Sequence, residues 1–290
     1  MVTGLHGSAG TRITPARWAA VRSAVAEAGE RFEQLVLGCD GGVMATADWT
    51  VADTAAHVAG IAWNYTSMVV SYDTDRPIGG VRDHLLGTTV DNIHTGLNAA
   101  LLRNFPEREP ARLVATLRAS IGKLLELSAD ADPASTVTWL GGARLPRAGL
   151  LAHLTNEMLI HGRDIAVATG RPWRIPEEHA ALFFELFIVE IIRNGTGVLL
   201  DGGRPRAGRI AVEFRSRYTA PVVIVVTDGE VSVEDPGGPV DARVGFRPAA
   251  LNLMLFHRVG RVRTALGGGV RVRGRRPWLL PAFLRKVRMP

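Results

Sequence analysis

The sequence predicts an α+β protein in which a helical bundle, residues 1–200, precedes a small α+β domain, residues 201–290. Up to about residue 193, apolar side chains recur every three or four positions, which is the period of an amphipathic helix. After the Gly- and Pro-rich segment 201–208, apolar residues alternate with polar ones or form β-branched runs, as in strands. A chain of 290 residues is long enough for two such domains.

The first 200 residues are expected to be mostly helical. Thr14 and Pro15 suit the cap and the first position of a helix that ends at Gly38. Thr50 and Asp53 resemble a capping box at the start of the next helix. Residues 130–144 are expected to be irregular or a short hairpin. The expected helices cover about residues 15–38, 50–70, 81–103, 110–128, 146–170 and 177–193. Long amphipathic helices with short connections are typical of a bundle.

The last 90 residues are expected to form a small sheet with two helices. The Asp228-Gly229 dipeptide between two β-rich runs indicates a tight hairpin. The expected strands are at about residues 209–217, 222–227, 230–234, 241–245 and 268–274, and the expected helices are at 248–259 and 277–286.

Charge is distributed unevenly along the chain. Residues 1–200 carry 17 basic and 21 acidic side chains, a net charge of −4, whereas residues 201–290 carry 17 basic and 7 acidic ones, a net charge of +10. Such a basic segment can attract nucleic acid, an anionic membrane or an acidic ligand. Because no nucleic-acid motif or interleaved aromatic residues accompany the arginines, we do not expect a nucleic-acid partner.

The chain lacks the sequence features of a membrane or secreted protein. It has no uninterrupted run of about 18 apolar residues, and its first ten residues do not resemble a signal peptide. We therefore expect a cytoplasmic protein with no membrane partner. Cys39 is the only cysteine, which excludes an internal disulfide and a cluster of thiolate ligands. Imidazoles and carboxylates would have to hold any metal, and a reactive thiol would come from a cofactor.

The helix at 146–170 carries a pattern that suits metal binding. His153, Glu157 and His161 are four residues apart, so they project from one face of the helix. Glu157 and His161 begin about 6 Å apart along the axis, close enough to share one divalent ion. His153 and His161 begin about 12 Å apart, which is too far, so a further ligand must come from another helix. His57 suits this role, although spacing alone does not distinguish such a site from solvated or hydrogen-bonded side chains.

Two segments resemble the metal-binding bundle of mycothiol-dependent maleylpyruvate isomerases and related DinB-like thiol transferases. One is the segment 49–60, Trp-Thr-Val-Ala-Asp-Thr-Ala-Ala-His-Val-Ala-Gly, and the other is the Glu-x3-His-Gly-x-Asp motif within 156–172. The resemblance implies a DinB-like four-helix bundle in which His57, Glu157 and His161 are the metal-binding and catalytic residues. Residues 201–290 resemble a sterol-carrier-protein-2-like (SCP2-like) domain. The chain departs from the family at Arg163, where relatives often have tryptophan.

The resemblance also implies the chemistry of the site. Three protein ligands leave one coordination position of a Zn²⁺ ion open, although iron, nickel or manganese would also suit these ligands. The implied cofactor is mycothiol, whose thiolate would be transferred to a small electrophilic, acidic substrate or would isomerise it from cis to trans. The candidates for holding the thiol cofactor or the acidic substrate are Arg271, Arg273, Arg275 and Arg276. Two alternatives remain: metal-dependent hydrolysis of a thiol conjugate, and a non-catalytic carrier of a hydrophobic metabolite.

Several other side chains receive provisional roles. Asp164 could orient His161 or form a surface salt bridge. His153 is interpreted as a pocket or core histidine, and Trp49 as a packing residue at the start of its helix. The remaining histidines that have no partner at metal-binding spacing are interpreted as structural: His84, His94, His179 and His257.

Overall fold

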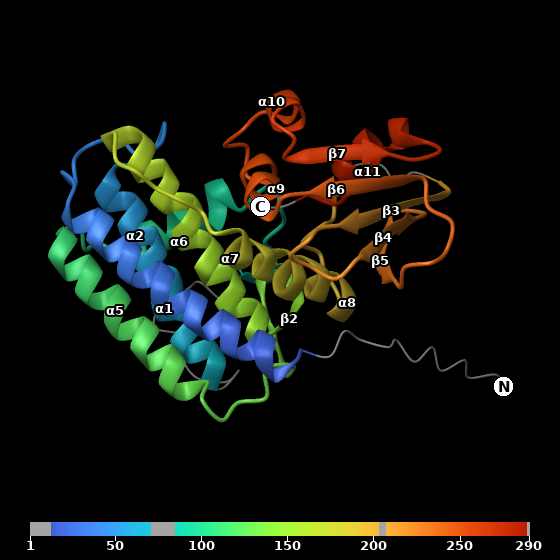
Figure 1. The fold of residues 1–290 in the computed structure, drawn as a ribbon. Coiled ribbons are helices and arrows are strands. Elements are labelled where there is room, and N and C mark those ends of the chain that lie inside the picture. The colour runs from blue at the N-terminus through green and yellow to red at the C-terminus, as the bar shows by residue number, and fades with distance from the viewer. Residues whose placement is uncertain (1–12, 71–84, 203–206, 289–290) are drawn as a thin grey trace.

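The computed structural model describes residues 13–70, 85–202 and 207–288, and its architecture is the α+β arrangement that the sequence predicts (Figure 1). A helical part is followed by a five-stranded mixed sheet with helices. Within the described residues, no helix is both long enough and apolar enough to cross a bilayer.

Four long helices pack together in the helical part: α1 (Pro15–Leu37), α2 (Val51–Val70), α5 (Pro110–Leu127) and α6 (Arg147–Thr169). The Thr14 side chain caps α1, as predicted. Gly170 ends α6 in the left-handed conformation (φ 66°), which glycine adopts without strain. Helix α6 lies at the centre and is buried along almost its whole length. Its polar side chains therefore face other parts of the protein.

The predicted helix at 81–103 is only partly correct. Residues 81–84 lie outside the described residues, Leu85 and Leu86 are helical, and helix resumes with the π-helical segment η1 (His94–Asn98), followed by α4 (Ala99–Asn104). Residues 87–93 form turns and irregular structure. The Asn92 side chain donates to the Gly87 carbonyl and accepts from the Thr89 N–H. Such local bonds compete with helix formation and explain the interruption.

The segment between α5 and α6 is a short hairpin. Strands β1 (Thr136–Thr138) and β2 (Arg144–Pro146) pair in antiparallel fashion around the turn η2 (Leu140–Gly142). Trp139 at the end of β1 is buried, with 3% of its surface exposed. The hairpin alternative for residues 130–144 is thus confirmed, and it places this indole beside α2 and α6.

The predicted helix at 177–193 is one continuous segment with a π-helical centre. It consists of α7 (Glu177–Leu182), η3 (Phe183–Val189) and α8 (Glu190–Asn194). Phe184 of η3 packs against Phe214 and Phe246 of the sheet, with ring centroids 5.5 and 4.8 Å apart. The helical part and the sheet therefore share one hydrophobic core. The domain boundary at residue 200 stays a prediction.

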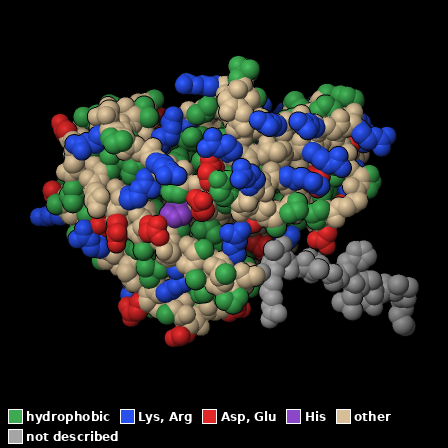
Figure 2. All heavy atoms as spheres, viewed as in Figure 1, with side chains coloured by type: hydrophobic (Ala, Val, Ile, Leu, Met, Phe, Trp, Pro, Cys, Tyr) green, Lys and Arg blue, Asp and Glu red, His purple; other side chains and the backbone are tan. Residues whose placement is uncertain are grey.

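All five predicted strands are present, with ends shifted by a few residues. They are β3 (Arg209–Arg215), β4 (Val222–Thr227), β5 (Glu230–Glu234), β6 (Ala242–Phe246) and β7 (Val270–Arg273), in the order β5-β4-β3-β6-β7. Neighbours are antiparallel except β3 and β6, which are parallel. Asp228-Gly229 forms the predicted hairpin turn. Arginine side chains gather over this part of the surface (Figure 2), in agreement with its net charge of +10.

The helices around the sheet differ from the prediction at one place. Helix α9 (Pro248–Leu255) ends four residues before Val259, and a separate helix α10 (Arg261–Leu266) follows. His257 adopts a left-handed conformation (φ 58°), and the N–H groups of Arg258 and Val259 both donate to the Leu253 carbonyl. This turn closes α9. The last predicted helix is confirmed as the turn η4 (Pro277–Leu279) and α11 (Leu280–Lys286).

Candidate metal centre

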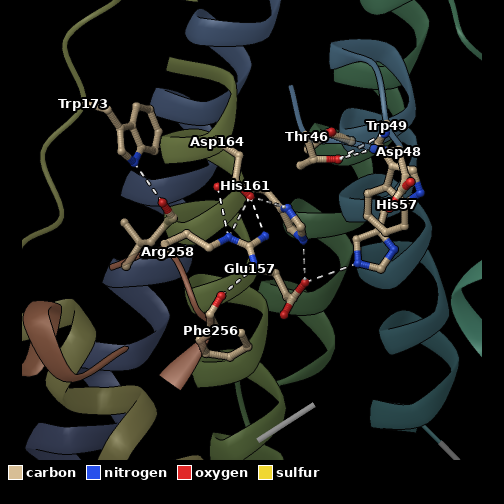
Figure 3. A network of polar contacts seen from close by, with 12 residues as sticks. Thr46, Asp48, Trp49, His57, Glu157, His161, Asp164, Trp173, Phe256 and Arg258 are labelled. Atoms are coloured by element: carbon tan, nitrogen blue, oxygen red, sulfur yellow. Dashed lines mark hydrogen bonds and ion pairs between the residues drawn. The ribbon is translucent and has the colours of Figure 1, made fainter. Parts of the chain in front are cut away.

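His57, Glu157 and His161 meet between α2 and α6, although 100 residues separate the first two (Figure 3). His57 Nε2 and His161 Nε2 each lie 3.3 Å from Glu157 Oε2. One ligand atom from each residue lies within 4.8 Å of the others. All three side chains are buried, with 5 to 9% of each residue exposed. The structure thus brings together the three residues that the sequence selects as metal ligands.

Two of the three spacings between these atoms fit a small divalent ion, and the two imidazole nitrogens, within 4.8 Å of each other, would have to approach on binding. Atoms bound at about 2.0–2.1 Å to a tetrahedral ion lie about 3.3–3.4 Å apart. The two nitrogen–oxygen distances of 3.3 Å match this value. Two imidazoles and one carboxylate suit Zn²⁺ and leave one coordination position for another molecule. The donor set therefore fits a catalytic metal.

The electrostatics of the site also favour cation binding. Burial would raise the pKa of Glu157, but the three imidazoles around it outweigh burial and hold that pKa well below its usual range. Burial likewise would lower the pKa of His161, but contacts with Asp164 and Glu157 raise it to about 9. Because a metal binds the neutral imidazole, a proton and a metal ion compete for His161.

Asp164 links His161 to the sheet part of the protein. Its Oδ2 lies 3.4 Å from His161 Nδ1 and 2.6 Å from Nη2 of Arg258 (Figure 3). Asp164 is 7% exposed, so this is a buried contact and not a surface salt bridge. Burial would raise the pKa of Asp164, but His161 and Arg258 lower it. Sequence reasoning missed Arg258, because the turn that carries it was expected to be helix.

Aromatic rings and one glycine shape the surroundings. Trp49 packs on His57 and on His161, with ring centroids 4.8 and 5.9 Å apart. It therefore contacts both histidines in addition to packing at the start of α2. Gly162 allows Trp173 to lie against α6, since a Cβ at Gly162 would lie 2.2 Å from the indole ring. Trp173 Nε1 donates to the Leu159 carbonyl at 2.9 Å.

A set of hydrogen-bonding side chains lies on the side of Glu157 that faces away from His161. His153 Nε2 lies 3.5 Å from Glu157 Oε1, and His153 Nδ1 lies 3.1 Å from the Tyr65 hydroxyl. The Tyr65 hydroxyl also accepts from Trp139 Nε1 at 2.9 Å. The structure agrees with the interpretation of His153 as a pocket residue. Sequence reasoning assigns no polar role to Tyr65 or Trp139. Tyr65 follows His57 by eight positions and lies on the same side of its helix, which is the one signal that could have indicated it.

A cavity of about 1040 Å³ opens beside the three candidate ligands. One wall comes from the helical part and includes Ile61, Met68 and Leu101, and another comes from α9, α10 and α11. Among the residues that the structure describes, four arginines line the cavity: Arg258, Arg261, Arg285 and Arg288. The site can therefore hold a molecule with both apolar and anionic groups against the metal ligands.

The four arginines proposed for cofactor binding lie elsewhere. Arg271, Arg273, Arg275 and Arg276 are exposed on or just after β7, and among the described residues they do not line this cavity. Arg276 instead pairs with Asp241. A cofactor-binding role for these four residues stays a prediction.

The other residues singled out by sequence have varied positions. His257 lines the cavity, whereas His179 lies 3.5 Å from Glu27. Arg163 is half-buried and absent from the described cavity lining. His84 and the His94 side chain lie outside the described residues.

Residues 16–166, more than half of the chain, match the family described as the mycothiol maleylpyruvate isomerase N-terminal domain. The chain belongs to this family. The match includes α1, α2, α5 and all three candidate ligands. No curated protein matches the sequence.

Solved structures of similar fold agree with this assignment. The crystal structure of the mycothiol-dependent maleylpyruvate isomerase has a TM-score of 0.50 and 13% identity to this family member, over 88% of this chain and 92% of that one. A point mutant of that isomerase matches with the same TM-score and coverage at 14% identity. At this identity the likeness extends to the fold alone, and it includes the sheet part as well as the helices.

Proposed function

We propose that this family member is a metal-dependent enzyme that uses mycothiol, with a divalent ion, most simply Zn²⁺, held by His57, Glu157 and His161. The observation that carries the proposal is the position of these three buried ligands at the wall of the 1040 Å³ cavity. A structural metal site is closed by protein ligands, whereas a catalytic site keeps a position open. When bound, the ion would lower the pKa of a thiol and hold it as a nucleophilic thiolate.

The surrounding residues would orient the reactants. The imidazoles of His57 and His161 are held by contacts with Trp49, and His161 is held also by Asp164. The apolar wall of the cavity would exclude water from the thiolate. S-transfer to an electrophile and cis-trans isomerisation of an electrophile both follow from addition of this thiolate to a carbon atom.

The cavity arginines favour an acidic electrophile. Arg258 and Arg288 pair with Asp164 and Asp91, while Arg261 and Arg285 are exposed and line the same cavity. A guanidinium group binds a carboxylate through two parallel hydrogen bonds. We infer that the substrate carries a carboxylate, and that this group lies toward α10 and α11.

The finer fold assignment is part of the same proposal. The packing of α1, α2, α5 and α6 supports a DinB-like bundle, and the sheet with α9 and α11 supports an SCP2-like appendage. The carrier alternative would need a hydrophobic cavity in the sheet part, where the apolar cavity described beneath the sheet holds only about 40 Å³. This volume is close to that of a water molecule and far too small for a lipid chain. The larger cavity has room for a hydrophobic metabolite, but it adjoins the three candidate metal ligands, which favours an enzyme.

Metal analysis of the purified protein tests the proposal. We expect about one divalent ion per chain, as three protein ligands define a single site. The ion should be lost in His57→Ala and Glu157→Ala, whereas His153→Ala keeps all three ligands and should still take up one ion per chain when the ion is supplied in excess. If the wild-type protein binds no divalent ion, both the mycothiol-dependent mechanism and the metal-dependent hydrolysis are excluded.

Incubation with mycothiol then distinguishes the thiol chemistries from hydrolysis. The metal-loaded protein is mixed with mycothiol and a panel of acidic and neutral electrophiles, and the products are identified by mass spectrometry. A mass increase by mycothiol indicates S-transfer, and an isomer of unchanged mass indicates isomerisation. If the protein instead hydrolyses a mycothiol conjugate and needs no free thiol, the proposal is wrong and the protein is a hydrolase.

A further inference from the structure

We propose that Tyr65 and His153 are positioning residues, which hold the Glu157 carboxylate in its metal-binding orientation without binding the ion themselves. This inference rests on the proposed metal site at His57, Glu157 and His161. It concerns the opposite side of Glu157 from the two histidine ligands. The proposal gives a role to Tyr65, His153 and Trp139, three buried side chains with polar groups that the metal site alone does not explain.

The direction of the hydrogen bonds follows from the outermost donor. An indole Nε1–H can only donate, so the Tyr65 oxygen must accept from Trp139 at 2.9 Å. The Tyr65 hydrogen is then free to be donated to His153 Nδ1, which lies 3.1 Å away. A neutral imidazole that accepts at Nδ1 carries its hydrogen on Nε2. That hydrogen faces Glu157 Oε1 across 3.5 Å.

The opposite direction would leave a buried donor without an acceptor. If His153 Nδ1 donated to Tyr65, the hydroxyl would accept from two donors, and neither neighbour could take its own hydrogen. Such an unsatisfied donor costs about 1–3 kcal/mol when buried. Burial also raises the pKa of the Tyr65 phenol, so this residue keeps its proton. Trp139 therefore donates to Tyr65 and Tyr65 donates to His153, whose Nε2–H faces Glu157.

Packing fixes the orientation of the His153 ring. The ring packs against both Trp139 and Phe187, with centroids 5.1 and 4.9 Å away. Trp139 and Phe187 are themselves in edge contact at 5.0 Å. Since these residues are nearly fully buried, the imidazole has little room to rotate. The distance of 3.5 Å from His153 Nε2 to Glu157 Oε1 is longer than an ordinary hydrogen bond, and the proposal requires it to shorten when Glu157 binds an ion.

The two oxygens of Glu157 thus face different partners. Oε2 faces His57 and His161, whereas Oε1 faces His153. A carboxylate that accepts a hydrogen bond at Oε1 is directed to bind an ion through Oε2 alone. Binding through one oxygen preserves the open coordination position that the thiol needs. Groups that orient a metal ligand in this way typically change metal affinity by about 10- to 100-fold.

Long-range ¹H–¹⁵N NMR of the histidine rings tests the direction of the hydrogen bonds in the metal-free protein. The spectra of the wild type and of His153→Leu identify the His153 signals by difference. We expect the Nε2–H form in the wild type, and a loss of that preference in Tyr65→Phe, which lacks the donor to Nδ1. A wild-type His153 with its hydrogen on Nδ1 would overturn the proposal.

Metal affinity, measured by competition with a chelator, tests the positioning role. We expect His153→Leu to bind one ion about 10- to 100-fold more weakly, and Tyr65→Phe to lose less. His153→Gln should recover part of the loss, because its amide can donate to Glu157. Thr155→Val is the matched control, since it removes a buried hydroxyl from α6 two positions away, where the helix faces elsewhere. This control should leave metal affinity unchanged.

A Co²⁺-loaded protein adds a spectroscopic readout that a purely structural role would not move. The intensity of the visible bands falls when a tetrahedral ion gains ligands, so we expect weaker bands in His153→Leu than in Thr155→Val. Equal affinity and equal spectra in these two variants would overturn this inference and leave the proposed function intact. A wild type that binds no metal would overturn both. Should His153→Leu fail to fold, Tyr65→Phe gives the same comparison.

Discussion

The Arg258 guanidinium contacts the Asp164 carboxylate through two nitrogens, with Nη2 2.6 Å from Oδ2 and Nε 3.1 Å from Oδ1. This pair joins the turn after α9 to the central helix α6 (Figure 3). Because Asp164 also contacts His161, the sheet part of the protein supports a candidate metal ligand in the helical part.

Arg258→Gln is therefore expected to affect both stability and metal binding. The variant removes the charged hydrogen-bond partner of buried Asp164 and leaves it only its contact with His161 among the charged partners described, which should lower the free energy of unfolding by about 2 kcal/mol. Urea denaturation of the metal-free protein measures this change. Metal affinity should also fall, because His161 loses its support. Arg261→Gln, in the same cavity wall, is the control.

A double-mutant cycle isolates the Arg258–Asp164 contribution. The effects of Arg258→Gln and Asp164→Asn on unfolding should sum to more than the effect of the double variant. Strictly additive effects would show that the two side chains do not stabilise each other.

Asp53 should stabilise the protein in a pH-dependent manner. Its carboxylate accepts from the Thr50 N–H and hydroxyl and pairs with Arg108. Burial would raise the pKa of Asp53, but these contacts lower it. A folded-state pKa below the unfolded value gives stability that is present above about pH 4 and is lost as the pH falls through the folded-state pKa. Asp53→Ala should cost about 1 kcal/mol at neutral pH and much less in acid.

Unfolding curves of wild type and Asp53→Ala at several pH values check this expectation. Thr50→Ser, which keeps the capping hydroxyl, is the control and should retain most of the pH dependence. A penalty for Asp53→Ala that stays constant into acid would contradict the electrostatic explanation.

Gly162→Ala should disturb the packing of Trp173 against α6, the helix that carries Glu157 and His161. The new Cβ would lie 2.2 Å from the Trp173 ring, so the indole must move and lose its bond to the Leu159 carbonyl. Overpacking of this kind costs about 1–3 kcal/mol, and the displaced indole should change the tryptophan fluorescence. Gly122→Ala is a matched control in helix α5, where no atom lies within 4 Å of the added methyl group. This control should be more stable than wild type by up to about 1 kcal/mol.

A divalent metal ion should raise the thermal stability of the protein. Binding to the folded state alone adds about 2.7 kcal/mol when the free ion is at 100 times its Kd. A chelator should reverse the increase, and His57→Ala should show none. An equal increase in His57→Ala would indicate that the ion binds elsewhere.

The sequence predicts most of this fold for identifiable reasons. The caps at Thr14 and Gly170 and the strand periodicity near Asp228-Gly229 act locally, and the structure confirms all three features. The helix predicted for residues 81–103 is interrupted at residues 87–93, where the Asn92 side chain bonds to neighbouring backbone groups, a competition that apolar periodicity does not register.

The candidate site is predictable only in part. The Glu157/His161 pair follows from helical spacing, but His57 lies 100 residues away, and only the family resemblance connects it to that pair. Arg258 gives no local signal, since its position depends on the turn at His257. Trp139 directly follows the three-residue strand β1 and gives no local signal, because its hydrogen bond to Tyr65 depends on tertiary packing.

The π-helical segment η3 has aromatic side chains on opposite sides. Phe187 packs against His153 beside the metal centre, while its neighbour Phe184 packs against Phe214 and Phe246 of the sheet. A fragment that ended at residue 200 would expose Phe184 to water and would be expected to aggregate. The helical part could therefore not be transplanted alone onto another scaffold, because unfolding of the sheet would loosen the same segment that packs beside His153.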